Sequence, residues 1–238
     1  MFRKPLPSII YAIGDVHGEA DRLRQMHDHI LDRHAHLHPK HPLKLIHLGD
    51  YVDRGPDSAG VIEQIMRVEK ISSVSCINLR GNHEAMMLDG LSQVFPTAKE
   101  HWLKHGGKET LQSYYDRGHS TVPDAHLKWL SACPLIHIEK ERKLIFVHAG
   151  IRPDEFPNDS PEIYLWTRSP AFFEMERWNN PDLVGWTVVH GHTPTDDFYP
   201  DEAEATSRRI NIDTGAVFGG RLTAAAFVPG ETVRFLYT

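Results

Sequence analysis

The sequence is poor in cysteine. Its 238 residues include only Cys76 and Cys133, which lie far apart and form no Cys-x-x-Cys pair. This pattern indicates neither a zinc ribbon nor a disulfide scaffold. We therefore expect a protein of a reducing compartment, with the cytoplasm as its location.

Long apolar runs are also absent. No segment approaches the roughly 18 apolar residues that a membrane-spanning helix needs. The first apolar run, at residues 9–13, is too short for the apolar region of a signal peptide, and Pro5 and Pro7 interrupt the segment before it. The sequence therefore predicts a soluble protein without a membrane partner.

Positive charge is not in excess, because 26 Lys and Arg stand against 32 Asp and Glu, a net charge of -6. This balance argues against a general nucleic-acid binder, although it is compatible with a local cationic pocket. No Gly-x-x-x-x-Gly-Lys loop is present, which disfavours an ATP-using enzyme. A content of 40% hydrophobic residues suffices for a proper core, and we expect one domain over residues 1–238.

What the chain does contain is a repeated pattern: a short apolar, β-branched run, then a loop with Gly and Asp or His. Runs without polar alternation are typical of strands covered on both sheet faces. Parallel strands bind ligands beyond their carboxyl ends, so the polar loops should meet at one edge. The six predicted strands are residues 9–13, 43–48, 74–79, 144–147, 186–189 and 210–212.

Helical periodicity separates the first three strands, at residues 19–35 and 57–68. Residues 85–135 are predicted to be a helical insertion that covers one end of the sheet. The proline-rich residues 152–181 are predicted to be a long, partly ordered loop. The runs at 222–228 and 232–237, divided by Pro-Gly, predict a closing hairpin.

The loop that follows residues 43–48 holds Asp50, Asp53 and Arg54. Two carboxylates so close repel each other unless a cation lies between them, and a divalent metal and Arg54 are the natural candidates. The Asp, His and Asn donors of the loops suit Mn, Fe or Zn, and no thiolate is available. Asp50 could bridge two metals, which requires a spacing of about 3.5–4 Å.

Three loops carry the motifs Gly14-Asp15-Val16-His17-Gly18, Gly49-Asp50-Tyr51-Val52-Asp53-Arg54-Gly55 and Gly81-Asn82-His83-Glu84. With these motifs the chain resembles the metallophosphoesterases of the phosphoprotein phosphatase type. Its later motifs, such as Trp166-Thr167-Arg168 and Gly191-His192-Thr193-Pro194, resemble the bacteriophage lambda protein phosphatase and bacterial serine/threonine protein phosphatases. The resemblance implies the α/β calcineurin-like fold, a central β-sandwich of mixed sheets flanked by helices.

The resemblance also implies a site with two metal ions, most simply Mn, with Fe or Zn as alternatives. Asp15 and His17 would bind the first metal and Asp50 would bridge to the second. The second metal would be completed by Asn82, His148 and His192. His190 could replace His192 as a ligand, although strand alternation favours His192.

In the same resemblance, His83 is the general acid and Asp53 orients its imidazole. Arg54, Arg80 and Arg168 would clamp the phosphate oxygens. The implied reaction is an in-line attack on phosphorus by a hydroxide that bridges the metals, without a phosphoenzyme.

The activity implied is that of a metal-dependent phosphomonoesterase, a protein serine/threonine phosphatase acting on a phosphorylated protein or a small phosphoester. A symmetrical dinucleoside tetraphosphate hydrolase of the same fold is the alternative, as is a metal-binding scaffold without turnover. A cysteine-based phosphatase is excluded, because Asn82 and Glu139 stand where such enzymes need Arg six residues after the cysteine. The preferred phosphoryl group and the oligomeric state stay open.

Three other features receive structural interpretations. Glu84 is expected to cap the helix that follows it, and Asp213 to shape a strand end. The histidines between His27 and His41 are expected to form a solvated surface, since they have no carboxylate partners at matching positions, although a His-rich tract can bind metal.

Overall fold

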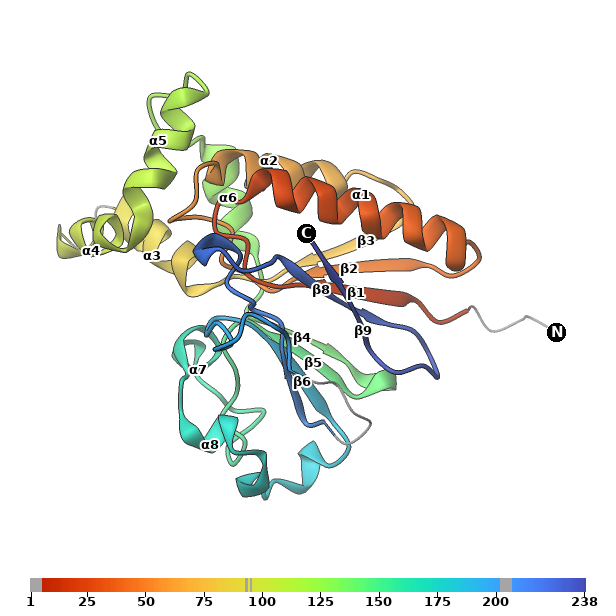
Figure 1. Ribbon diagram of the computed structural model, residues 1–238. Helices are drawn as coiled ribbons and strands as arrows, with labels where there is room; N and C mark the ends of the chain where they lie inside the picture. Colours follow the sequence, from red (N-terminus) through yellow and green to blue (C-terminus); the bar gives the residue numbers. More distant parts are fainter. Residues whose placement is uncertain (1–5, 93, 95, 202–206) are drawn as a thin grey trace.

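Two β-sheets pack face to face at the centre of the molecule (Figure 1). The computed structural model describes residues 6–92, 94, 96–201 and 207–238. The strand order is β3-β2-β1-β8-β9 in the first sheet and β4-β5-β6-β7 in the second. The expected sandwich of mixed sheets flanked by helices is confirmed.

The first sheet combines three parallel strands with an antiparallel hairpin. The hairpin, β8 and β9, confirms the prediction for the end of the chain. The sheet consists of β1 (Ile9–Ile13), β2 (Leu43–His47), β3 (Val74–Asn78), β8 (Thr223–Phe227) and β9 (Arg234–Tyr237).

In the second sheet, three parallel strands carry one antiparallel edge strand. The edge strand β4 is not among the predicted strands, because His137 and Glu139 interrupt its short apolar run. The other predicted strands agree with the structure to within one residue at each end. The sheet consists of β4 (Ile136–Glu139), β5 (Leu144–Val147), β6 (Thr187–His190) and β7 (Arg209–Asn211).

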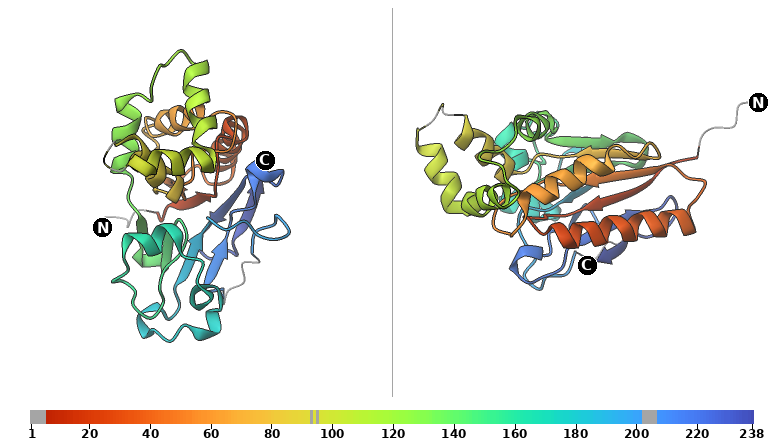
Figure 2. Two further views of the ribbon diagram at one scale, coloured as in Figure 1. Left: turned by 90° about the vertical axis from the view of Figure 1, so that its left-hand side faces the viewer. Right: turned by 90° about the horizontal axis from the view of Figure 1, so that it is seen from above.

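Strand β1 shows how the core is divided. Ile9, Tyr11 and Ile13 point to the helices, whereas Ile10 and Ala12 point to the second sheet. Helices α1 (Ala20–Leu37) and α2 (Ser58–Val68) cover the outer face, as the view from above shows (Figure 2). Both faces are therefore apolar, which explains the absence of polar alternation.

Four helices follow β3 and project beyond one end of the first sheet (Figures 1 and 2). A π-helical turn, Leu103–Gly107, joins two of them. They are α3 (Asn82–Leu91), α4 (Pro96–Trp102), α5 (Lys108–Asp116) and α6 (Asp124–Ala132). We refer to residues 85–135 as the insertion.

The prediction of a long loop over residues 152–181 is wrong in part. The segment contains α7 (Pro161–Trp166) and α8 (Pro170–Phe173), which cover the outer face of the second sheet. Each begins with a proline, because proline at the first helical position loses no hydrogen bond and has a suitable φ. Pro161 and Pro170, two of the prolines that suggested an irregular loop, therefore begin helices. None of the described helices is long and apolar enough to cross a membrane.

Candidate metal centre

The loops that follow β1, β2, β3, β5 and β6 bring buried histidines and carboxylates together where the two sheets meet. Among the described residues, two groups of three His and Asp side chains have ligand atoms within 4.8 Å of one another. Both groups contain Asp50, whose loop lies at the carboxyl end of β2. The groups are His17, Asp50 and His83, and Asp50, His148 and His192.

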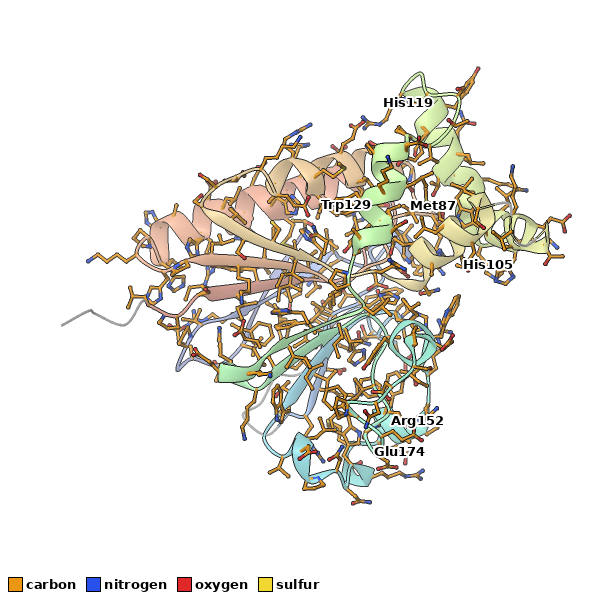
Figure 3. The ribbon with its side chains drawn as sticks, turned by 180° about the vertical axis from the view of Figure 1, so that it is seen from behind. Met87, His105, His119, Trp129, Arg152 and Glu174 are labelled. Atoms are coloured by element: carbon orange, nitrogen blue, oxygen red, sulfur yellow. The ribbon has the colours of Figure 1, made fainter. Side chains whose placement is uncertain are left out.

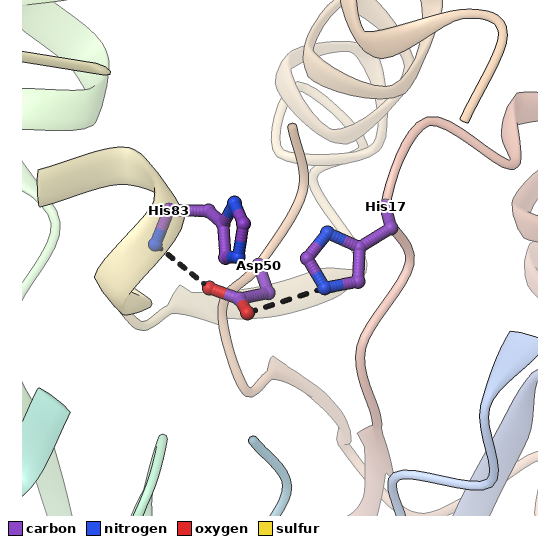
Figure 4. Close-up of side chains that lie close together, drawn as sticks. All are labelled: His17, Asp50 and His83. Atoms are coloured by element: carbon purple, nitrogen blue, oxygen red, sulfur yellow. Dashed lines mark hydrogen bonds and ion pairs between the residues drawn. The ribbon is translucent and has the colours of Figure 1, made fainter. Parts of the chain in front are cut away.

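Asp50 links the two groups, because its carboxylate contacts a histidine of each. Its Oδ2 lies 3.3 Å from Nε2 of His17, and its Oδ1 lies 3.3 Å from Nε2 of His148. Oδ1 also accepts a hydrogen bond from the backbone N–H of His83 at 3.0 Å (Figure 4). Burial opposes ionisation, but His148, His83 and His17 hold the pKa of Asp50 well below its ordinary value.

The histidine rings are oriented by main-chain carbonyls. Nδ1 of His17 donates to the carbonyl of Val52 at 2.8 Å, and Nδ1 of His148 donates to that of Leu48 at 3.0 Å. A carbonyl only accepts, so in the neutral form of either ring the hydrogen is on Nδ1 and the Nε2 lone pair is available to a metal. Metal-binding histidines are oriented in this way.

A conflict between acceptors marks a place for a cation. The amide Oδ1 of Asn82 lies 2.9 Å from Nε2 of His148 and 2.9 Å from Nδ1 of His192. Burial lowers the pKa of His148, so its neutral ring has one hydrogen for two acceptors, Asn82 and the carbonyl of Leu48. A metal ion between the lone pairs would remove this conflict, so the donor set fits a metal.

Asp15 adds a second sign. It is buried, and its Oδ1 has no hydrogen-bond partner among the described residues. Burial, then Asp213 and Asp50, raise its pKa well above the ordinary value, whereas Oδ2 accepts from the backbone N–H of His192 at 3.1 Å. A cation would stabilise this cluster of acids. A Cβ at Gly191 would lie 2.1 Å from Oδ1 of Asp15, so only glycine fits there.

The loops are strained at the positions that carry these side chains. Positive φ angles occur at His17 (43°), Asp50 (52°), Asp53 (73°) and His192 (70°). Such angles are unfavourable for residues with a Cβ and concentrate at functional sites. The backbone therefore supports a site that is shaped for something other than stability.

His83 and Asp53 form a buried pair, with Nδ1 of His83 2.7 Å from Oδ2 of Asp53. Oδ1 of Asp53 accepts from Nε1 of Trp102 at 2.9 Å and from Oγ1 of Thr110 at 2.7 Å. Both donors come from the insertion and were not predicted, because no motif surrounds them. The insertion thus holds the carboxylate that orients His83.

Glu84 ties two of the loops together. Its fully buried carboxyl group accepts from the backbone N–H of Gly81 and of Asp50, both at 2.8 Å. It also accepts from the N–H of Tyr51 at 2.7 Å. One side chain therefore caps α3, as expected, and also fixes the loop of Asp50.

A cavity of about 460 Å³ opens beside the two groups. Arg54 and Arg168 line it, with Nη1 of Arg54 2.5 Å from Nε2 of His17 and Nε of Arg168 3.2 Å from Nε2 of His192. The pocket lining also includes four residues that were not predicted, Met86, His101, His105 and Trp166.

A family model described as calcineurin-like phosphoesterase matches residues 9–220. The chain belongs to this family. The phosphoesterase is 28% identical to a protein of Bacillus thuringiensis named bis(5'-nucleosyl)-tetraphosphatase PrpE [asymmetrical], over 93% of this chain and 91% of that one. A relative of the same name from Halalkalibacterium halodurans is 29% identical with the same coverage.

Solved structures share the fold of this phosphoesterase. One described as a candidate diadenosine tetraphosphatase has a TM-score of 0.65 at 22% identity and covers 98% of this chain and 96% of its own. A serine/threonine phosphatase from Saccharomyces cerevisiae has a TM-score of 0.59 at 14% identity, covering 97% of this chain and 79% of its own. The specific resemblance to the lambda phosphatase stays a prediction.

The position of Arg80 differs from the expectation for a phosphate clamp. Its Nε donates to the carbonyl of Leu130 at 3.2 Å, and its Nη2 donates to that of Ser131. These carbonyls belong to the last turn of α6, which attracts cationic side chains. Arg80 does not line the cavity among the described residues.

The remaining histidines are His190, the alternative ligand, and the tract between His27 and His41. His190 lies outside both groups, and burial and Arg209 lower its pKa to about 3, whereas His192 lies beside Asp50. The expectation of a solvated histidine tract is wrong at His27 and His34, which are buried. His27 contacts another buried histidine, His47, with 2.8 Å between their Nε2 atoms.

Proposed function

We propose that this phosphoesterase hydrolyses dinucleoside tetraphosphates asymmetrically. Its similarity to the PrpE proteins along almost the whole chain carries the proposal. This reading keeps the predicted fold and site and changes the preferred substrate from a phosphoprotein to a nucleotide. It also differs from the symmetrical cleavage that the sequence suggested as an alternative.

Six side chains would hold the metals in this proposal: Asp15, His17, Asp50, Asn82, His148 and His192. Bound metals would polarise the phosphate oxygens and activate water at neutral pH. Mn is the first metal to test, followed by Fe and Zn. The acceptor conflict at Asn82 and the unpartnered Oδ1 of Asp15 support this assignment.

The remaining residues would bind and protonate the substrate. Arg54 and Arg168 offer paired N–H donors to phosphate oxygens from two sides of the cavity. His83, whose Nδ1 is held by Asp53, has Nε2 left to protonate the leaving oxygen. His83 also lies within one of the potential metal groups, so metal content must be measured in any variant of it.

A phosphomonoesterase that acts on phosphorylated proteins is the second candidate. The three motifs with Asp15, Asp50 and His83 favour it, since they resemble those of the phosphoprotein phosphatases. Both candidates need the same metals and arginines. They differ in the group attached to the reacting phosphate, which is a nucleotide in the first candidate and a protein side chain in the second.

Product analysis separates the candidates. We expect the Mn-loaded protein to convert diadenosine tetraphosphate to ATP and AMP in equal amounts, faster than it releases phosphate from a phosphoserine peptide. Hydrolysis of a phosphotyrosine peptide at the same rate as the phosphoserine peptide would leave diadenosine tetraphosphate the preferred substrate. ADP as the only product would indicate symmetrical cleavage, and turnover of peptides alone would overturn the proposal.

A further inference from the structure

Two exposed aromatic side chains adjoin the candidate metal centre, and the proposed chemistry uses neither. Trp166, the last residue of α7, is 43% exposed, and Phe218, in the turn after β7, is 54% exposed. Exposed single apolar residues are common, but Trp166 lies beside His192 of the centre and Phe218 lies beside the cavity-lining Arg54. Their position therefore calls for a functional interpretation.

Trp166 adjoins the group that contains His192. The two ring centroids are 6.2 Å apart and the rings are nearly perpendicular, at 85°, so the indole is not stacked face to face on the imidazole. Arg168 follows two residues later and contacts the same histidine, and both residues line the cavity. One short segment thus presents an aromatic ring and a guanidinium to the same histidine.

Phe218 lies near the other group, the one that contains His17. The guanidinium carbon of Arg54 lies 5.4 Å from the centre of its ring, and Arg54 contacts His17. Each group therefore has a cavity-lining arginine with an exposed aromatic ring beside it. The pairs are Trp166 with Arg168 and Phe218 with Arg54.

The cavity itself has the size of a small-molecule site. Its volume of about 460 Å³ lies within the range of about 300–1,000 Å³ for ligand pockets. His101 and His105 line it from the insertion, and Figure 3 shows His105 at the edge of the insertion that faces the second-sheet half of the molecule. A phosphate chain inside the cavity would have Trp166 in the cavity wall, and Phe218 next to Arg54, which lines it.

We propose that Trp166 and Phe218 are stacking platforms for the bases of a dinucleoside polyphosphate, one beside each arginine. Such a ligand has an anionic chain in the middle and an aromatic base at each end, which matches two arginines that line one cavity, each with an aromatic ring nearby. Aromatic side chains stack on any base, so we infer selection for the presence of a base rather than for its identity. This inference rests on the proposed function for the class of ligand.

The test compares two inhibitors of aryl phosphate hydrolysis by the Mn-loaded protein, ATP and inorganic tripolyphosphate. They share a triphosphate and bind metals similarly, so the ratio of their inhibition constants reports the nucleoside. ATP has one base, which can stack on one ring at a time. We therefore expect at least one of the variants Trp166→Ala and Phe218→Leu to raise the inhibition constant of ATP about 5- to 150-fold. Tripolyphosphate should change less than about twofold.

Both variants should raise KM for diadenosine tetraphosphate, which has two bases. Trp166→Phe keeps an aromatic face and should remain close to wild type. Tyr115→Ala removes an exposed aromatic residue that lines a different pocket, formed by the insertion alone, and is the matched control. Quenching of tryptophan fluorescence by ATP, reduced in Trp166→Phe, would report stacking independently of turnover.

Unchanged ATP inhibition in both variants would overturn the inference. Equal losses for ATP and tripolyphosphate would also overturn it, because they would indicate damage to the phosphate site. Failure of the proposed function looks different: the wild-type protein would hydrolyse the aryl phosphate but not diadenosine tetraphosphate. The inhibitor ratio would still decide whether the two rings bind a base.

Discussion

Two buried clusters of histidines in the described part of the chain differ in how their hydrogen bonds balance. Between α1 and β2, His27 and His47 form a chain with two amides. Gln64 Nε2 lies 3.3 Å from His27 Nδ1, and His47 Nδ1 lies 2.7 Å from Oδ1 of Asn78. Together with the Nε2–Nε2 contact of 2.8 Å, each neutral ring has one donor and one acceptor satisfied.

At the candidate metal centre this balance fails. Both nitrogens of His148 face acceptors, and Oδ1 of Asp15 has no partner among the described residues. The comparison teaches that burial of histidine alone says little about function. An excess of acceptors over hydrogens indicates residues that fit a cation, whereas a balanced chain indicates a structural core.

The largest effect is expected from a substitution in the candidate metal centre, at His83. His83→Ala should lower turnover by roughly 10²–10⁴-fold, because general acid catalysis is lost, while the protein keeps its metals. Steady-state kinetics and elemental analysis check both points. Unchanged turnover would reject His83 as the acid, and lost metal would show that it is a ligand.

A smaller effect is expected behind the site, at Trp102. Trp102→Phe removes the N–H that donates to Asp53, so the carboxylate orients His83 less well. We expect activity to fall about 10- to 100-fold, as for other residues that support a site. Trp129→Phe is the control, because its N–H donates to Glu69, outside the centre. Equal activity of the two variants would contradict the role of Trp102.

The buried pair His27 and His47 should affect the free energy of unfolding and not the activity. Burial and His47 lower the pKa of His27 to about 2, and burial lowers that of His47 to about 4. In the unfolded chain these two histidines bind protons as the pH falls through about 6.5, whereas in the folded state they stay neutral there. Stability is therefore complete above pH 6.5 and falls as pH decreases toward 4, by up to about 1.4 kcal/mol per pH unit for each histidine.

Urea unfolding at pH 7.5, 6.5 and 5.5 measures this slope. Because His190 and His192 also have lowered pKa values, the comparison with His27→Gln isolates the contribution of His27. The variant should show a shallower loss of stability than the wild type over this range. Parallel pH curves would show that His27 is not the neutral group that the structure indicates.

Much of this arrangement was predictable from sequence. Apolar runs without alternation predicted six strands, and the motifs after them placed Asp50 with His17 and His148. What escaped prediction depends on tertiary contacts. Trp102 and Thr110 donate to Asp53 from a segment without a motif, and the partner of the buried His27 is His47, which lies on another element.

Two further differences have local causes. Arg80 follows a strand, as a phosphate-binding residue might be expected to, yet the carbonyls at the end of α6 bind its guanidinium. Nothing in the sequence near Arg80 indicates where α6 ends. The prolines of residues 152–181 suggested a loop, but Pro161 and Pro170 each begin a helix.

The metal content of Asp50→Asn tests most directly whether the acceptor excess marks two cation positions joined by one carboxylate. Wild type, Asp50→Asn and the core variant His27→Gln would be loaded with Mn and measured by elemental analysis after removal of free metal. We expect two equivalents in the wild type and in His27→Gln, and reduced occupancy of both positions in Asp50→Asn. Two full equivalents in Asp50→Asn would contradict the account.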